Sequence, residues 1–248
     1  MINSVRNTVL FLLNKDNRGY ITPLEYNYFA KQAQLEIFEQ YFSDYSKSVN
    51  LQNIRRKAIG HGDSVSQIQN KIDIFTTSST LNYTDVSPTS VGGLDDYFIL
   101  PTNLYKLVNI TYKSKIIQGV PTSKFDMLVN SNLTAPSVTY PIYKRNGSNI
   151  FIRPLSIYYT GATPQHSSEF PVICNYIRKP LDPIWGYTTI INDPVYNSDS
   201  STNFELPSSD EAALVIRICK LAGLSIREND VVQATNAMEG VEYQKQNS

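Results

Sequence analysis

The stretch Pro23–Phe42, PLEYNYFAKQAQLEIFEQYF, constrains the fold more than any other part of the sequence. Thr22 and Glu25 form a capping box around Pro23, which is typical of the first turn of an α-helix. At about 100° per residue, the apolar side chains of this helix fall on two nearly opposite stripes. The first stripe contains Tyr26, Phe29, Ala30, Ala33, Ile37 and Tyr41, and the second contains Leu24, Tyr28, Leu35, Phe38 and Phe42. We therefore expect the helix to be covered on both sides, by the C-terminal helices or by a neighbouring subunit.

Apolar spacing divides the rest of the chain into helical ends and a β-rich middle. Residues 1–65 and 205–248 carry helical spacing, and Ser208 with Glu211 forms another capping box before a helix that we expect to stop at Gly223. Residues 66–204 alternate apolar and polar side chains between Pro, Gly, Asn and Ser, and Asn146-Gly147 predicts a type I′ hairpin. The predicted fold is α+β: a helical bundle formed by the N- and C-terminal helices, with a central antiparallel β-rich insertion that is sandwich-like or barrel-like.

The charge composition argues against a protein that grips nucleic acid through a basic face. Lys plus Arg and Asp plus Glu both number 22, so the formal net charge is zero. Charged residues make up only 18% of the chain, whereas Tyr occurs 17 times, as in surfaces covered by other protein. An all-β secreted domain has a similar composition. No stretch reaches the length of a membrane span, and the two cysteines form no metal-binding pattern, so we expect a soluble protein assembled in a cytoplasm.

The segment Asn14–Glu25, NKDNRGYITPLE, aligns with the loop of a calcium-binding EF-hand. Arg18, however, occupies a ligand position, and Lys15 with Arg18 offsets the charges of Asp16 and Glu25. Since calcium needs several anionic oxygens, we interpret this segment as a connection between two helices rather than as a metal site.

No other group of residues assembles into an active site. The basic cluster Arg55–Lys57 lacks stacking aromatic residues, and the two histidines, His61 and His166, have no catalytic motif around them. Asp95 and Asp96 are adjacent, so on a strand they would point to opposite faces. We predict a protein that is not an enzyme and needs no cofactor or metal.

Three segments resemble virion neck proteins of crAss-like and related short-tailed, podovirus-type bacteriophages. They are NKDNRGYITPLEYNYFAKQAQLEIFEQYF, YIRKPLDPIWGY and NFELPSSDEAALVIRICKLAGLSIRE. The resemblance implies a head-to-tail adaptor, or tail-tube-like ring, located in the virion neck under the portal protein. The ring is expected to be a homo-oligomer of twelve subunits. The resemblance also implies contacts with other tail or neck ring proteins, and DNA that passes through the lumen without sequence-specific binding.

The resemblance and the helix pattern indicate two sets of candidate interaction residues. The second apolar stripe supplies candidate subunit-interface residues, namely Tyr28, Leu35, Phe38 and Phe42. The polar C-terminal tail supplies candidate portal-docking residues, namely Tyr243, Gln244, Lys245 and Gln246. The alternative function is a receptor- or carbohydrate-binding β module of a virion or secreted system. It would use exposed aromatic rings, whereas Trp185, flanked by Pro and Gly, is expected to anchor a turn against the core.

Overall fold

The computed structural model describes residues 1–14, 21–54, 61–84, 96–157, 171–191, 193–226, 237, 238 and 240. The chain divides into two compact units. Residues 1–74 and 180–248 together form the first, here called the helical unit, and residues 75–179 form the second, here called the sheet unit. These boundaries differ from the predicted ones at residues 66 and 204, because the helical pattern continues to Asp73 and residues 180–204 pack with the helices.

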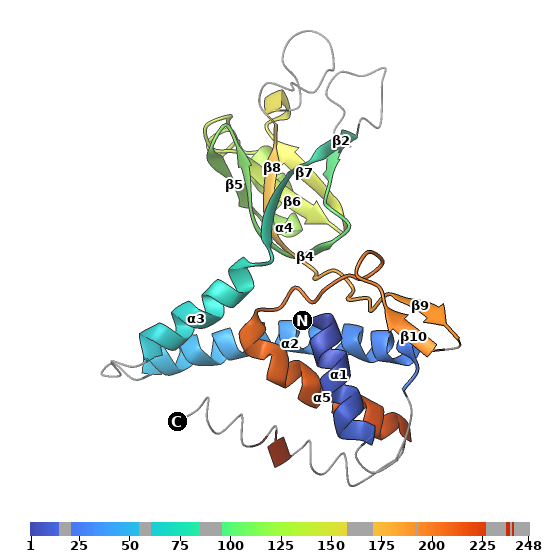
Figure 1. The fold of residues 1–248 in the computed structure, drawn as a ribbon. Helices are drawn as coiled ribbons and strands as arrows, with labels where there is room; N and C mark the ends of the chain where they lie inside the picture. The colour runs from blue at the N-terminus through green and yellow to red at the C-terminus, as the bar shows by residue number, and fades with distance from the viewer. Residues whose placement is uncertain are drawn as a thin grey trace. The chain divides into compact units, whose positions relative to one another are not determined.

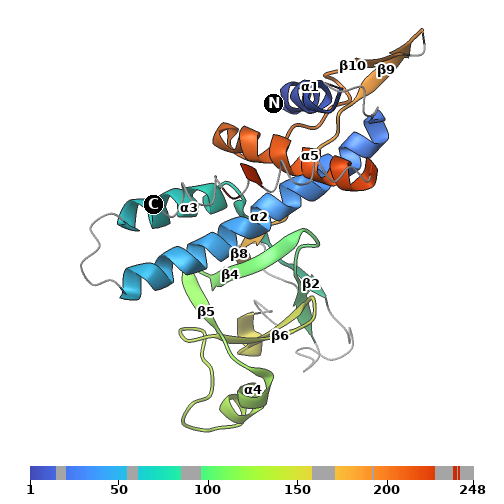
Figure 2. The same cartoon turned by 90° about the horizontal axis from the view of Figure 1, so that it is seen from below.

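The described residues of the helical unit form four long helices, drawn in blue, cyan and orange-red in Figure 1. They are α1 (Ile2–Asn14), α2 (Pro23–Ile54), α3 (His61–Asp73) and α5 (Glu211–Ile226). Helix α5 packs against both α1 and α2, and α3 returns along the second half of α2 (Figures 1 and 2). No helix in the described parts of the chain combines the length and the apolar character that a membrane crossing requires.

The two apolar stripes of α2 have different surroundings. The first stripe is buried, apart from a half-buried Phe29. In the second stripe Phe38 is fully buried, whereas Leu24 and Tyr28 remain 61% and 64% exposed. The second stripe is therefore covered at Phe38 and open to solvent at the start of the helix.

The ends of the helices agree with the sequence only in part. At the start of α2 the predicted capping box is present, because the Thr22 N–H donates to Glu25 Oε2 at 2.9 Å and the Glu25 N–H donates to Thr22 Oγ1 at 3.3 Å. The predicted box at Ser208 is wrong: a short 3₁₀ turn, η2 (Ser208–Asp210), follows Pro207 without a side-chain cap. Helix α5 also continues through Gly223, since glycine permits a helix stop but does not impose one.

The helical unit also holds a small two-stranded hairpin. Strands β9 (Tyr187–Ile190) and β10 (Asp193–Tyr196) pair antiparallel, with Ile190 opposite Asp193 and Tyr187 opposite Tyr196. The predicted β-rich middle, residues 66–204, included these residues, but β9 and β10 form no pair with the main sheet.

The sheet unit is built on one eight-stranded sheet. Its spatial order is β1-β8-β4-β5-β6-β7-β3-β2. The strands are β1 (Thr76–Thr80), β2 (Asn82–Thr84), β3 (Tyr97–Ile99), β4 (Leu104–Tyr112), β5 (Lys115–Gly119), β6 (Ile142–Asn146), β7 (Asn149–Arg153) and β8 (Ile173–Arg178). The two edge strands, β1 and β2, are separated in sequence by Leu81 alone, so the sheet has to curl back on itself. The result is barrel-like (Figure 1).

The sheet is mixed rather than purely antiparallel, which corrects the predicted topology. Strand β5 pairs parallel with β6, with Gln118 opposite Ile142. Between these strands lies α4 (Thr122–Val129), which packs on β6 and buries Phe125. A parallel pair needs a crossover connection, and α4 lies within that connection.

The core and the turns of the sheet unit follow the sequence pattern closely. Alternate residues of the strands point inward and form one cluster, which lies entirely within residues 75–179: Leu81, Phe98, Leu100, Ile110, Tyr112, Ile117, Ile150, Ile152, Ile157, Val172, Cys174 and Tyr176.

The predicted hairpin between β6 and β7 is present, but its turn is shifted by one residue. Asn146 pairs with Asn149, and Gly147 alone has a positive φ, of 59°. This pattern fits a type II′ turn centred on Gly147 and Ser148 rather than the predicted type I′ turn.

Candidate assembly surfaces of the helical unit

A polar stripe on α2 holds the chain that leads to the β9–β10 hairpin. Asn27, Lys31 and Gln34 lie on successive turns of the helix, and each bonds to the segment that follows the sheet unit. Gln34, which is buried, donates to the carbonyl of Leu181 at 2.7 Å, and Lys31 pairs with Asp182 at 2.6 Å. Asn27 accepts from the Trp185 N–H at 2.8 Å. The segment from Leu181 to Trp185 therefore lies along α2 in a fixed register.

Trp185 is the anchor at the end of this segment. Its ring is 2% exposed, as the sequence predicted, and its Nε1–H donates to Asn3 of α1 at 3.1 Å. The guanidinium carbon of Arg6 lies 3.7 Å from the ring centre, in cation–π geometry. Tyr187 and Tyr196, at the base of the hairpin, lie with their ring centres 5.7 Å and 5.9 Å from that of Trp185. The base of the hairpin is thus bound to both α1 and α2.

A close backbone approach tightens this base further. Gly186 donates its N–H to Ser201 Oγ at 2.9 Å and accepts from the Asn197 N–H at 2.9 Å. A Cβ added at Gly186 would lie 2.6 Å from the backbone carbon and oxygen of Ser200. Glycine is needed here because the two chain segments leave no room for a side chain.

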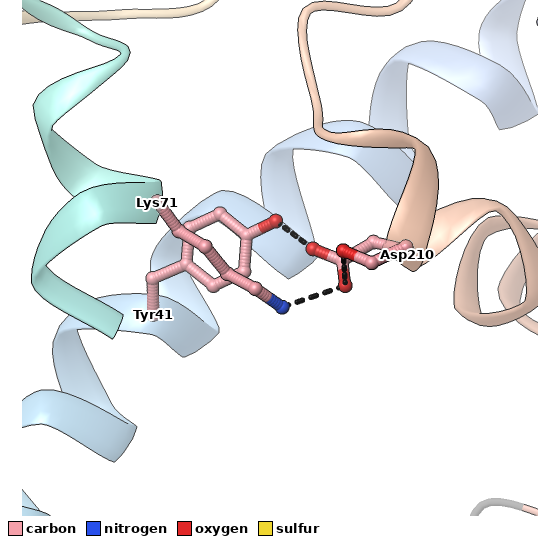
Figure 3. A network of polar contacts seen from close by, with 4 residues as sticks. Tyr41, Lys71 and Asp210 are labelled. Carbon is pink, nitrogen blue, oxygen red and sulfur yellow. Dashed lines mark hydrogen bonds and ion pairs between the residues drawn. The ribbon is translucent and has the colours of Figure 1, made fainter. Parts of the chain in front are cut away.

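A second polar network joins the N-terminal and C-terminal parts of the helical unit (Figure 3). The hydroxyl of Tyr41 on α2 donates to Asp210 Oδ2, and Lys71 on α3 pairs with Asp210 Oδ1 at 2.7 Å. Burial, followed by the hydrogen bond and the charge of Asp210, raises the pKa of Tyr41 well above its ordinary value. Tyr41 therefore remains a neutral donor, and the network connects α2, α3 and the turn before α5.

The hairpin itself extends from this fixed base into solvent. Every residue of β9 is exposed, and so is each residue of β10 apart from the half-buried Pro194. The apolar side chains on it are 37% to 94% exposed: Tyr187, Ile190, Ile191, Val195 and Tyr196. Isolated two-stranded hairpins are marginally stable in water, so an exposed apolar hairpin held rigidly at its base is a typical protein-contact element.

Helix α1 carries a second exposed surface of unusual composition. Its solvent-facing residues lie three or four positions apart and include no charged side chain: Ser4, Asn7, Thr8, Phe11 and Leu12. Arg6 is the one charged residue of α1, and it is buried. The outer face of a solvated helix is ordinarily charged, so the composition of this face is unusual for a surface that only water covers.

The four candidate interface residues of α2 do not form one surface. Tyr28 is exposed, Leu35 and Phe42 are half-buried, and Phe38 is fully buried within the single chain. Phe38 packs edge to face on Phe42, with ring centres 5.2 Å apart. Phe38 is therefore a core residue, since helix periodicity cannot distinguish cover from the same chain and cover from another. The candidate tail residues Tyr243, Gln244, Lys245 and Gln246 lie outside the described residues.

Only some of the residues that the sequence analysis weighed as catalytic or metal sites lie in the described part of the chain. Glu25 is engaged by its capping partners, and the bonds from Thr22 lower the pKa of its carboxyl. Residues 15–20 of the calcium-like loop lie outside the described part, as do Arg55–Lys57, Asp95 and His166. Within the described part no three His, Cys, Asp or Glu side chains gather as metal ligands. Burial raises the pKa of both Cys174 and Cys219 to about 11, which keeps these thiols protonated and unreactive at neutral pH.

Comparison with known proteins gives no relative from which a role could be transferred: no family model matches the chain, and no curated protein matches it in sequence. Sequence reasoning predicted the burial of Trp185 but missed the hairpin and the residues of α1 and α2 that hold it. Their signal was present in the spacing of Asn27, Lys31 and Gln34, which place one long polar side chain on each turn between two apolar stripes.

Proposed function

We propose that this protein is a structural component of a phage neck, a ring of identical subunits that joins the portal to the tail and surrounds the DNA channel. The proposal is supported by the three segments that resemble neck proteins of short-tailed phages. All three contribute to the helical unit: the first contains the Pro23–Phe42 part of α2, the second contains the Leu181–Trp185 segment, and the third contains α5.

The observation that carries the proposal is the rigidly anchored, largely apolar hairpin, with Asp193 as its one charged residue, together with the charge-free surface of α1. A ring subunit needs two contact surfaces per copy, and interfaces between identical subunits are apolar and poor in charge. In this proposal α1, α2, α3 and α5 act together as the helical bundle of the ring, and the C-terminal tail docks on the portal. The protein would reside in the virion after assembly in the host cytoplasm.

The test is the mass of the purified protein, measured by light scattering over a range of concentrations and checked by negative-stain electron microscopy. We expect a closed ring, dodecameric in the simplest case, with a central opening. A protein that stays monomeric at every concentration would contradict ring formation. In that case a binding screen against glycans would examine the alternative, a receptor- or carbohydrate-binding β module.

A further inference from the structure

The pairing register of β9 and β10 separates the hairpin into two faces. Side chains alternate along each strand, and directly opposed residues share a face. Tyr187 and Tyr196 are opposed and lie beside Trp185, so this face is turned toward the anchor. The other face carries Ile190 opposite Asp193 and Thr188 opposite Val195. Ile190 and Val195 are 55% and 44% exposed on this outward face.

The tip of the hairpin adds an apolar side chain in a strained conformation. Ile191 is 94% exposed and has a φ of 49°. The left-handed region is unfavourable for a β-branched residue by roughly 1–2 kcal/mol, and asparagine or glycine is the ordinary choice in such a turn. For the hairpin alone, isoleucine is therefore an unfavourable residue at position 191, because its apolar side chain is exposed and its backbone is left-handed. A contact that buries the side chain would explain why isoleucine is present in spite of both costs.

The outward face of the hairpin and the exposed surface of α1 are chemically complementary. Phe11 and Leu12 are 70% and 49% exposed and match the aliphatic tip of the hairpin. Ser4 and Asn7 can donate hydrogen bonds to the carboxylate of Asp193, which is the one charge on the outward face. Pairing two hairpins with each other would instead bring two Asp193 carboxylates together, which is unfavourable.

We propose that the β9–β10 hairpin of one copy docks on the exposed α1 surface of a second copy, through Ile190, Ile191 and Val195 against Phe11 and Leu12. The contact is head-to-tail, because its two sides are different surfaces of the same chain. Repeated around an axis, such a contact closes into a ring. This inference rests on the proposed ring function and identifies its subunit contact.

Two single substitutions in the full chain test the contact from its two sides. Ile191→Asn removes the apolar tip and also relieves the backbone strain, so the melting temperature of the subunit should hold or rise while assembly weakens at least tenfold. Phe11→Gln removes the centre of the α1 surface and should weaken assembly to a similar extent. Leu133→Gln, at a 93% exposed position of the sheet unit, is the matched control and should assemble like the wild type.

Mixing the two variants identifies the partners. The Ile191→Asn chain keeps an intact α1 surface, and the Phe11→Gln chain keeps an intact hairpin, so a mixture should form one-to-one dimers that do not grow into rings. Sedimentation velocity of each variant and of the mixture measures this. The inference would be overturned if either variant formed rings as the wild type does, or if the mixture gave no dimers. Either result would leave the proposed ring function standing. A wild-type chain that remains monomeric would overturn both.

Discussion

At the scale of single residues, the position of the β9–β10 hairpin depends on a few side chains that hold Trp185 and on the absence of a side chain at Gly186. Arg6, Asn3 and Asn27 hold Trp185, and Gly186 lets the chain pass against Ser200. Polar groups buried in this way are costly when one partner is removed, because the other is left without its hydrogen bond. Substitutions of these anchoring residues should therefore lower the stability of the helical unit, and any effect on assembly should follow from that loss of stability.

Gly186→Ala should destabilise the helical unit by roughly 1–3 kcal/mol, because the new Cβ would meet the backbone of Ser200 and force the two segments apart. Urea denaturation followed by tryptophan fluorescence measures this, since Trp185 is the only tryptophan and lies beside the site. Gly240→Ala is the control, because nothing lies within 4 Å of a Cβ at that position. Equal stability of the two variants would show that the backbone adjusts at Gly186 without cost.

Glu25→Gln should reduce stability in a way that depends on pH. The bonds from Thr22 hold the folded-state pKa of Glu25 below its ordinary value of 4.5. A carboxyl whose pKa is lowered by folding stabilises the protein above its unfolded-state pKa, and this contribution is lost as the pH falls through the folded-state pKa. The difference between wild type and variant should therefore be constant above about pH 5.5 and shrink below about pH 4.5.

Chemical denaturation of both proteins across this range provides the measurement. Glu39→Gln, at an exposed position farther along α2, is the control for removing a carboxylate from the same helix. A wild-type to Glu25→Gln difference that persists unchanged to pH 3 would argue that the carboxylate is not what stabilises the cap. The separate expectation that Asn14–Glu25 binds no calcium is checked by calorimetry, where a saturable heat at millimolar calcium would contradict it.

At the scale of elements, the turn between β4 and β5 has a strained backbone that the sequence pattern does not reveal. Lys113 and Ser114 connect β4 to β5 with φ values of 49° and 62°, the pair of left-handed residues that a type I′ turn requires. Neither residue is favoured in this conformation. The β6–β7 turn, by contrast, uses Gly147 at its single left-handed position.

The double substitution Lys113→Asn with Ser114→Gly should stabilise the sheet unit by about 1 kcal/mol, because the new residues adopt left-handed backbone more readily. A rise of a few degrees in the thermal midpoint is expected, measured by circular dichroism. The opposite change in the neighbouring hairpin, Gly147→Ala, should lower the midpoint through backbone strain alone, since its Cβ would meet no atom within 4 Å. If both changes moved the midpoint in the same direction, the assignment of turn types would be wrong.

At the scale of the whole molecule, the two units differ in how they use the chain. The core of the sheet unit lies within residues 75–179, whereas the helical unit combines residues from both ends. The Tyr41–Asp210 contact and the packing of α5 on α1 and α2 join segments far apart in sequence. The sheet unit is therefore a continuous insertion into a discontinuous helical unit.

The fragment 75–179 should fold alone and unfold cooperatively, because it retains every residue of its core cluster. The fragment 1–74 should not fold alone, because without α5 the buried stripe of α2 would be exposed to water. Circular dichroism and the dispersion of amide resonances distinguish the outcomes. An unfolded 75–179 fragment would mean that the sheet depends on the helical unit.

The sequence by itself determined the features that depend on local spacing. The start of α2 at Thr22 and Glu25, the buried face of that helix, the hairpin after β6 and the burial of Trp185 all follow from residues within a few positions of one another. In each case the physical cause is local: a cap bonds its own first turn, and periodicity sets which side chains share a face.

Only the tertiary structure decided which surfaces meet. Phe38 is core and Tyr28 is exposed although both belong to one stripe, because residues distant in sequence cover Phe38 and leave Tyr28 open to solvent. The parallel β5–β6 pair and the assignment of β9 and β10 to the helical unit depend on contacts between residues distant in sequence. The exposed outward face of the hairpin, which carries the candidate subunit contact, therefore emerged only from the tertiary structure, since periodicity shows that a face is apolar but not what covers it.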